Sequence, residues 1–124
     1  MPYVWFGDRS PSEISDRELR REAEEAAIPV EQTNGPVLLI AAGGDAVWDS
    51  VRLSRLAMDR LEGADRSRED ELAVYPEAGH ALGAPYVPTG DSTARFGGTP
   101  PANARANEDA WRKATSLLDR TLEP

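Results

Sequence analysis

Asp45 and His80 have the chemistry of a proton-transfer pair. Asp45 follows Gly43-Gly44, and His80, the only histidine in the chain, follows Gly79. In a nucleophile–acid–histidine triad the histidine takes the proton of the nucleophile, while the carboxylate fixes the imidazole tautomer and stabilises the imidazolium. In one known chain order of triad residues the nucleophile comes first, the acid second and the histidine last. The order of Asp45 and His80 fits the last two of these. Each residue also fits an ordinary turn or loop, so their spacing alone leaves both interpretations open.

Both residues directly follow expected β-strands. A continuous apolar run over residues 36–41 is typical of a strand buried on both faces, and a second short strand is expected over residues 72–75. Between them, apolar residues recur at helical spacing over 51–61, with Asp49 or Ser50 as the cap. Two strands joined by a helix form one right-handed βαβ unit. The carboxyl ends of its two strands lie at the same edge of the sheet, and α/β proteins form their binding and catalytic sites at that edge.

Three further segments complete the expected order. A short, charged and largely solvated helix is predicted over residues 13–27, capped by Ser12. Residues 81–104 are rich in glycine and proline without periodicity, which predicts a long loop. A last helix is expected over 104–122, with one apolar stripe formed by Trp111, Ala114, Leu118 and Leu122.

These elements indicate an α/β fold in two parts. Residues 1–27 form an N-terminal extension with the charged helix, and residues 28–124 form the segment with the Asp and His loops. Parallel sheets are normally larger than two strands and covered on both faces. We therefore expect the chain to be part of a larger sheet, incomplete as a domain.

Composition excludes several classes of function. The 124 residues carry a net charge of −8, which argues against nucleic acid and anionic membranes as partners. No apolar run approaches the length of a membrane span, and the N-terminus lacks the pattern of a secretory signal. The absence of cysteine excludes disulfides, thiolate metal sites and a cysteine nucleophile within these residues. We expect a cytoplasmic protein.

Several segments are similar to one known family. They are Ile28-Pro29-Val30-Glu31, Gly35 to Ile40, Asp45 to Ser50, Tyr75 to His80, Gly97-Gly98-Thr99-Pro100, Ala102-Asn103-Ala104 and Asp109-Ala110-Trp111. Together they resemble the C-terminal part of the acyl-CoA thioester hydrolase and bile-acid-CoA:amino-acid N-acyltransferase family of α/β hydrolases, over roughly residues 28–122.

The resemblance implies a fold and a reaction. It implies the last two parallel strands of an α/β-hydrolase fold with their flanking helices, Asp45 as triad acid, His80 as triad base, and an acyl-CoA-type substrate. No metal or redox cofactor is needed for that chemistry. Two positions depart from the family pattern: Gly44 stands where an acidic residue is usual, and Asp49 where proline is frequent.

The nucleophile of such a triad is missing from the expected place. In the family a serine or cysteine stands on a strand–turn–helix elbow before the acid, and no Gly-x-Ser-x-Gly sequence occurs here. The nearest approach is Ser92, which follows the histidine and has no strand before it, so we interpret it as a loop residue. The oxyanion hole formed beside the nucleophile is expected to be missing too.

These observations leave several hypotheses open. The chain is a piece of a longer hydrolase, or one half of an enzyme whose N-terminal chain carries the nucleophile. Alternatively it is an inactive remnant or small interaction module that self-associates through an open sheet edge, or part of another α/β hydrolase of the esterase or dienelactone-hydrolase type. The length of the acyl chain stays open, and so does whether water or an amine accepts the acyl group.

Two features near the expected site also allow two interpretations each. Trp48 and Trp111 either line an acyl or pantetheine pocket or pack between helices, and packing is favoured. The loop after His80 either covers an acyl-CoA site or is a plain connection to the last helix.

Overall fold

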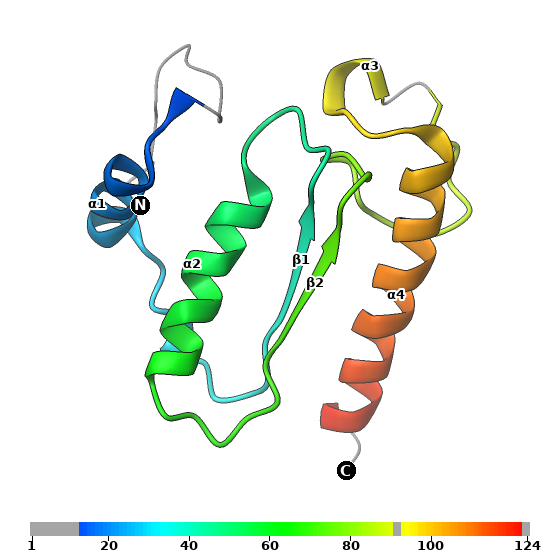
Figure 1. The fold of residues 1–124 in the computed structure, drawn as a ribbon. Helices are drawn as coiled ribbons and strands as arrows, with labels where there is room; N and C mark the ends of the chain where they lie inside the picture. Colours follow the sequence, from blue (N-terminus) through cyan, green and yellow to red (C-terminus); the bar gives the residue numbers. More distant parts are fainter. Residues whose placement is uncertain (1–12, 91–92, 123–124) are drawn as a thin grey trace.

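The computed structural model describes residues 13–90 and 93–122, and these form an α/β arrangement (Figure 1). In chain order the elements are α1 (Asp16–Ala26), the 3-10 helix η2 (Val30–Gln32), β1 (Leu38–Ala42), α2 (Ser50–Gly63), β2 (Glu71–Tyr75), α3 (Thr93–Phe96) and α4 (Pro100–Leu122).

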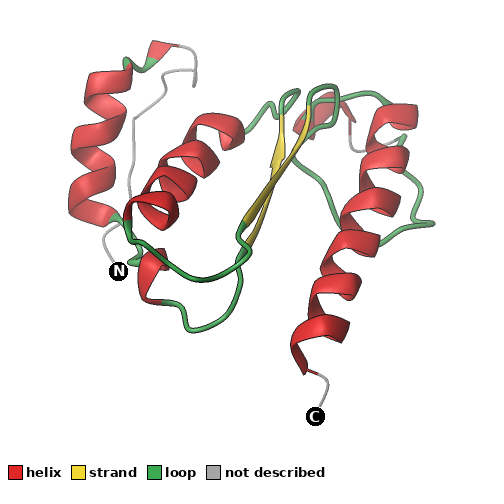
Figure 2. Cartoon of the chain, turned by 60° about the horizontal axis from the view of Figure 1, so that its bottom comes forward, coloured by secondary structure: helices red, strands yellow, loops and turns green. Residues whose placement is uncertain are grey.

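The two strands form a parallel sheet with helices on both sides. β1 and β2 pair in register from Leu38↔Glu71 to Ala42↔Tyr75. Figures 1 and 2 show α2 against one face of this sheet and α4 along the other, with α1 outside α2. The predicted βαβ unit is therefore confirmed, and both strands end on the same side of the molecule.

The crossover helix α2 begins where the sequence predicts a cap. Asp49 is the N-cap residue and accepts a hydrogen bond from the Arg52 N–H at 3.2 Å, the usual way to satisfy a donor that the first turn leaves unpaired. Ser50 ties the helix start to the strand before it, because its hydroxyl both accepts from the Ala42 N–H and donates to the Ala42 carbonyl.

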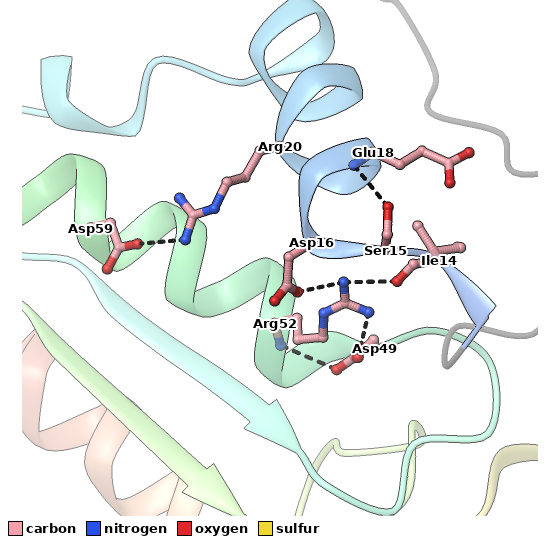
Figure 3. A network of polar contacts seen from close by, with 8 residues as sticks. All are labelled: Ile14, Ser15, Asp16, Glu18, Arg20, Asp49, Arg52 and Asp59. Carbon is pink, nitrogen blue, oxygen red and sulfur yellow. Dashed lines mark hydrogen bonds and ion pairs between the residues drawn. The ribbon is translucent and has the colours of Figure 1, made fainter.

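Helix α1 is attached to α2 by a polar network (Figure 3). The Arg52 guanidinium donates to the Ile14 carbonyl at 2.9 Å and to Asp16 at 2.7 Å. The cap of α1 is Ser15, whose hydroxyl accepts from the Glu18 N–H at 3.2 Å. The predicted cap, Ser12, lies outside the described residues. A serine followed three residues later by glutamate is a capping pattern, which makes Ser15 the better choice.

Arg66 ties together the two segments that lead into the strands. Its guanidinium donates to the carbonyl oxygens of residues 31, 33 and 35 and to the Asp70 carboxylate. Asp70 in turn accepts from the Val37 N–H at 2.8 Å. Both charged side chains are 8% exposed, and this pair fixes the start of β1 beside the start of β2.

Helix α4 begins earlier than predicted, at Pro100 instead of residue 104. Thr99 accepts from the Asn103 N–H with its carbonyl at 2.8 Å and from the Ala102 N–H with its hydroxyl at 3.3 Å. Pro100 and Pro101 fit the first turn because an N–H there has no helical partner in any case. The short α3 also interrupts the predicted loop over 81–104, so that prediction is wrong for part of its length.

The buried face of α4 also differs from the predicted stripe. Its buried residues are Ala102, Asn103, Ala106, Asn107 and Ala110. Trp111, Leu118 and Leu122 from the predicted stripe are each more than half exposed. Small side chains let the first half of α4 lie close to the loops that follow the strands, while its second half leaves large apolar side chains uncovered.

Candidate functional site

The site lies where the two strands end, and backbone bonds join the loops there. The Gly43 N–H donates to the Tyr75 carbonyl at 2.9 Å, and the Gly44 N–H donates to the Ala78 carbonyl at 2.8 Å. A side chain at Gly43 would overlap the backbone of Pro76. The glycine pair is therefore needed for close approach of the two loops, which brings the residues that follow each strand together.

The Asp45 carboxylate is almost completely buried, with 3% of the side chain exposed. One oxygen, Oδ1, accepts hydrogen bonds from the Val47 N–H at 2.8 Å and the Trp48 N–H at 3.2 Å. These local bonds orient the carboxylate so that its second oxygen, Oδ2, faces His80.

His80 meets this second oxygen. Its Nδ1 lies 2.9 Å from Asp45 Oδ2. The ring lies between Trp48, edge-on with centroids 5.2 Å apart, and Phe96, tilted at 5.9 Å. A carboxylate only accepts hydrogen bonds, so in the neutral imidazole this contact requires the proton on Nδ1 and leaves Nε2 as the basic nitrogen. The pair predicted from the sequence is thus brought into direct contact.

The remaining ring nitrogen has no protein partner in the part of the chain that the structure describes. Nε2 makes no hydrogen bond to residues 13–90 or 93–122, and 31% of the His80 side chain is exposed. The imidazole borders a cavity of about 430 Å³. An oriented histidine with its basic nitrogen open has the geometry that general-base chemistry requires.

The cavity is largely apolar and includes both tryptophans discussed above. Trp48 and Trp111 both line it, together with Ile40 of β1 and Ala114 of α4. Each indole is about half exposed, so the favoured prediction that they pack between helices is wrong. Ser50 also borders the cavity, but its hydroxyl is bonded to the backbone of Ala42.

Three residues of this site were not singled out from the sequence as functional. Phe96 packs beside the imidazole, and its carbonyl accepts from the His80 N–H at 2.8 Å. Gly97 pairs with Asp45 in an isolated antiparallel bridge. The Asn103 carboxamide accepts from the Gly79 N–H at 2.7 Å. The sequence pattern that could have revealed Asn103 is the repeat of alanine and asparagine at helical spacing over residues 102–110, which indicates a buried helix face.

The serine considered as a nucleophile, Ser92, lies outside the described residues. Within residues 13–90 and 93–122 no three His, Asp or Glu side chains gather in a way that would hold a metal ion. No helix in that same part of the chain is both long and apolar enough to cross a membrane.

Comparison with known proteins identifies the family. The model of the family described as BAAT / acyl-CoA thioester hydrolase C terminal matches residues 12–124. The chain belongs to this family. The match covers both strands, both loops and all of α4, so it includes Asp45, His80 and the contacts around them.

Relatives in this thioester hydrolase family are considerably longer. The chain is 31% identical over 112 residues to acyl-coenzyme A thioesterase 6 of Mus musculus, covering 84% of the chain and 26% of the relative. It is 32% identical over 103 residues to the peroxisomal succinyl-coenzyme A thioesterase of Mus musculus, covering 77% and 24%. Acyl-coenzyme A amino acid N-acyltransferase 2 of Mus musculus is 38% identical over 104 residues, covering 77% and 24%. The chain thus spans about a quarter of the length of these curated relatives.

Proposed function

We propose that this chain is the C-terminal segment of an α/β hydrolase that cleaves acyl-CoA thioesters, with His80 as general base and Asp45 as its orienting acid. The observation that carries the proposal is the 2.9 Å contact between His80 Nδ1 and Asp45 Oδ2, with Nε2 left open beside the cavity. Membership of the thioester hydrolase family supports the reaction class. From the charge and composition we keep the cytoplasm as the proposed compartment.

The proposed reaction has two stages. His80 Nε2 takes the proton of a serine or cysteine nucleophile, whose oxygen or sulfur forms a bond to the acyl carbonyl carbon. As the tetrahedral intermediate collapses, the carbon–sulfur bond to coenzyme A breaks and the leaving sulfur takes the proton from His80. A water or an amine then attacks the acyl carbonyl carbon of the acyl-enzyme and gives its proton to His80. As the bond from that carbon to the enzyme's oxygen or sulfur breaks, His80 returns a proton to the nucleophile, and the free acid or the amide is released. Asp45 stays ionised and stabilises the imidazolium each time it forms.

The nucleophile in this proposal comes from sequence outside the chain. The matched relatives are about four times as long as the part that the chain covers, 26% of acyl-coenzyme A thioesterase 6. That additional sequence is on the same polypeptide or on a separate N-terminal chain that binds this one. Either arrangement must bring a hydroxyl or thiol within hydrogen-bonding reach of His80 Nε2.

The cavity beside His80 is the proposed site for the acyl or pantetheine part of the substrate. Trp48 and Trp111 present half-exposed indoles there, and burial of alkyl chain against such surfaces is favourable by about 25 cal/mol per Å². The proposed partner is accordingly a small acyl-CoA-type molecule.

The test uses the complete protein or complex in which this segment occurs. We expect His80→Ala and Asp45→Asn each to lower kcat for thioester hydrolysis by about 10³–10⁴-fold, because a triad without its oriented base retains little more than binding and oxyanion stabilisation. Release of free coenzyme A measures the reaction, with and without an amino acid acceptor to separate hydrolysis from transfer. Glu77→Gln, an exposed change between β2 and His80, is the matched control and should leave kcat unchanged. Full activity of the His80→Ala protein would contradict the proposal.

A further inference from the structure

Two asparagines on α4 lie in surroundings where asparagine is unusual. Asn103 is 1% exposed and Asn107 is 4% exposed. The other buried positions of the helix, Ala102, Ala106 and Ala110, are all alanine. A buried amide is costly unless its polar atoms have partners, so these two side chains must be explained by what they bond.

Both amides bond the backbone of the segment that carries His80. Asn103 Oδ1 accepts from the Gly79 N–H at 2.7 Å, directly before the histidine. Asn107 Oδ1 accepts from the Gly83 N–H at 2.9 Å, three residues after it. One turn of α4 therefore bonds the chain on both sides of His80 (residues 79–83), a segment without a helix or strand of its own.

Asn103 also reaches the second loop that borders the site. Its Nδ2 lies 3.4 Å from the Gly97 carbonyl. Gly97 is the residue paired with Asp45, and the preceding carbonyl, of Phe96, accepts from the His80 N–H. A side chain at Gly98 would overlap both the Asn103 amide and the Gly79 N–H. The carboxamide therefore lies at a junction where three backbone segments meet.

This junction determines where the imidazole lies relative to the carboxylate. The Asp45 carboxylate is oriented by bonds within its own loop, from the Val47 and Trp48 N–H groups. His80 has no such local bonds from its side chain and reaches Asp45 only if residues 79–83 stay in place. A hydrogen bond at 2.9 Å weakens steeply when one partner moves by a fraction of an ångström or turns out of line.

We propose that Asn103 and Asn107 are positioning residues that hold the His80 backbone so that Nδ1 bonds Asp45 and Nε2 stays open to the cavity. The inference deepens the proposed function and rests on it, because it assigns these amides a role in the geometry of the proton-transfer pair. Neither amide touches the reacting atoms.

The spectroscopic test uses the complete protein or complex in which this segment occurs, with the His80 signals assigned by their absence in His80→Ala. With ¹⁵N-labelled histidine at a pH where the imidazole is neutral, NMR reports which ring nitrogen carries the proton and whether an Nδ1–H proton is protected from exchange. The parent protein is expected to show the Nδ1–H tautomer and a protected proton. Asn103→Ala should lose the protected signal and give a mixture of tautomers. Asn107→Ala should weaken that signal to a smaller extent, since Gly83 is further from the histidine.

Two further variants separate positioning from loss of stability. Asn103→Asp keeps the oxygen that accepts from the Gly79 N–H but replaces Nδ2, which faces the Gly97 carbonyl, with a second oxygen. It is therefore expected to recover part of the Nδ1–H signal that Asn103→Ala loses. Leu61→Ala removes a fully buried side chain near the C-terminal end of α2, far from the strand ends (Figure 1). It should lower the unfolding midpoint and leave the tautomer unchanged.

The outcomes distinguish the two proposals. A parent protein without the Nδ1–H tautomer contradicts the pairing of His80 with Asp45, and both proposals fail. A parent protein with that tautomer, together with an Asn103→Ala variant that keeps it, overturns the positioning role alone. Loss of the signal in Leu61→Ala to the same extent as in Asn103→Ala would likewise overturn it, since the amide would then act only through stability.

Discussion

Single glycines limit which side chains the site tolerates, and Gly97 is the clearest case. Its φ of +78° lies in the left-handed region, and a Cβ there would overlap the Gly44 carbonyl oxygen. Gly97 thus combines a backbone conformation that L-residues avoid with a contact that leaves no space for a methyl group. Because Gly97 pairs with Asp45, the limit applies directly to the loop that carries the acid.

Gly97→Ala is expected to destabilise the chain by about 2 kcal/mol or more, from backbone strain and overlap together. Urea unfolding followed by circular dichroism measures the change. Gly63→Ala makes the same substitution in α2, where nothing lies within 4 Å of the added methyl group. That control should raise stability by about 0.5 kcal/mol, because alanine favours the helix. Equal stability of the Gly97→Ala chain and its parent would show that the loops relax without cost.

At the residue scale, the sequence predicts that Asp45 and His80 approach each other, but it does not predict the residues that hold them in place. Asp45 and His80 follow predicted strands that run parallel, so their approach follows from topology. Asn103 is distant in sequence from both and lies on a segment interpreted in part as a loop, so its bond to Gly79 required knowledge of how α4 packs. The glycines at 97 and 98 gave no sign of their positive φ without the fold.

Among the connections between elements, the Arg66–Asp70 pair holds the two strand starts together. Burial would raise the pKa of the Asp70 carboxyl, but the hydrogen bond from the Arg66 guanidinium and that from the Val37 N–H outweigh it and lower this pKa below its ordinary value of 3.8. A carboxyl whose pKa is lower in the folded state contributes stability above its unfolded pKa. That contribution is lost as the pH falls through the folded pKa.

Asp70→Asn is therefore expected to lower the free energy of unfolding by about 3 kcal/mol at pH 7, since it leaves a buried guanidinium without its charged partner. The difference between variant and parent should shrink below about pH 4, where the carboxyl of the unfolded parent chain becomes protonated. Unfolding midpoints measured from pH 7 to pH 3 test both statements. Asp65→Asn is the control: Asp65 is exposed and has a φ of +48° that asparagine tolerates, so its effect should be small at every pH. A difference for Asp70→Asn that is independent of pH would contradict the charge argument.

The elements themselves were predictable where periodicity or a continuous apolar run is strong. Both strands and α2 follow from the patterns over residues 36–75, with ends shifted by one or two residues. The start of α4 was missed because Thr99-Pro100-Pro101 looks like a loop when proline is taken only as a helix breaker. In a first turn proline costs little, and Thr99 supplies the cap.

Over the whole molecule, the described residues leave apolar surface uncovered. In residues 13–90 and 93–122 each strand pairs on one side only, and Ile40 of β1 and Val74 of β2 are each more than a third exposed. The continuous apolar run of the first strand predicts burial on both faces, which this part of the chain does not provide. Trp111, Leu118 and Leu122 extend the exposed apolar surface along α4.

Such a surface is expected to make the 124-residue chain self-associate, because open strand edges and large apolar patches favour contact with further protein. Sedimentation velocity over a range of concentrations should show species larger than the 13.5 kDa monomer. Leu118→Glu places a charge in the exposed apolar stripe of α4 and should lower association about tenfold or more, since a charge buried in an interface without a partner costs at least the 1.4 kcal/mol that this factor represents. Arg105→Gln changes the net charge by the same amount at another exposed position of α4, and should leave association nearly unchanged. A chain that stays monomeric at high concentration would show that this surface is stable in water, and would contradict the inference that it needs a protein partner.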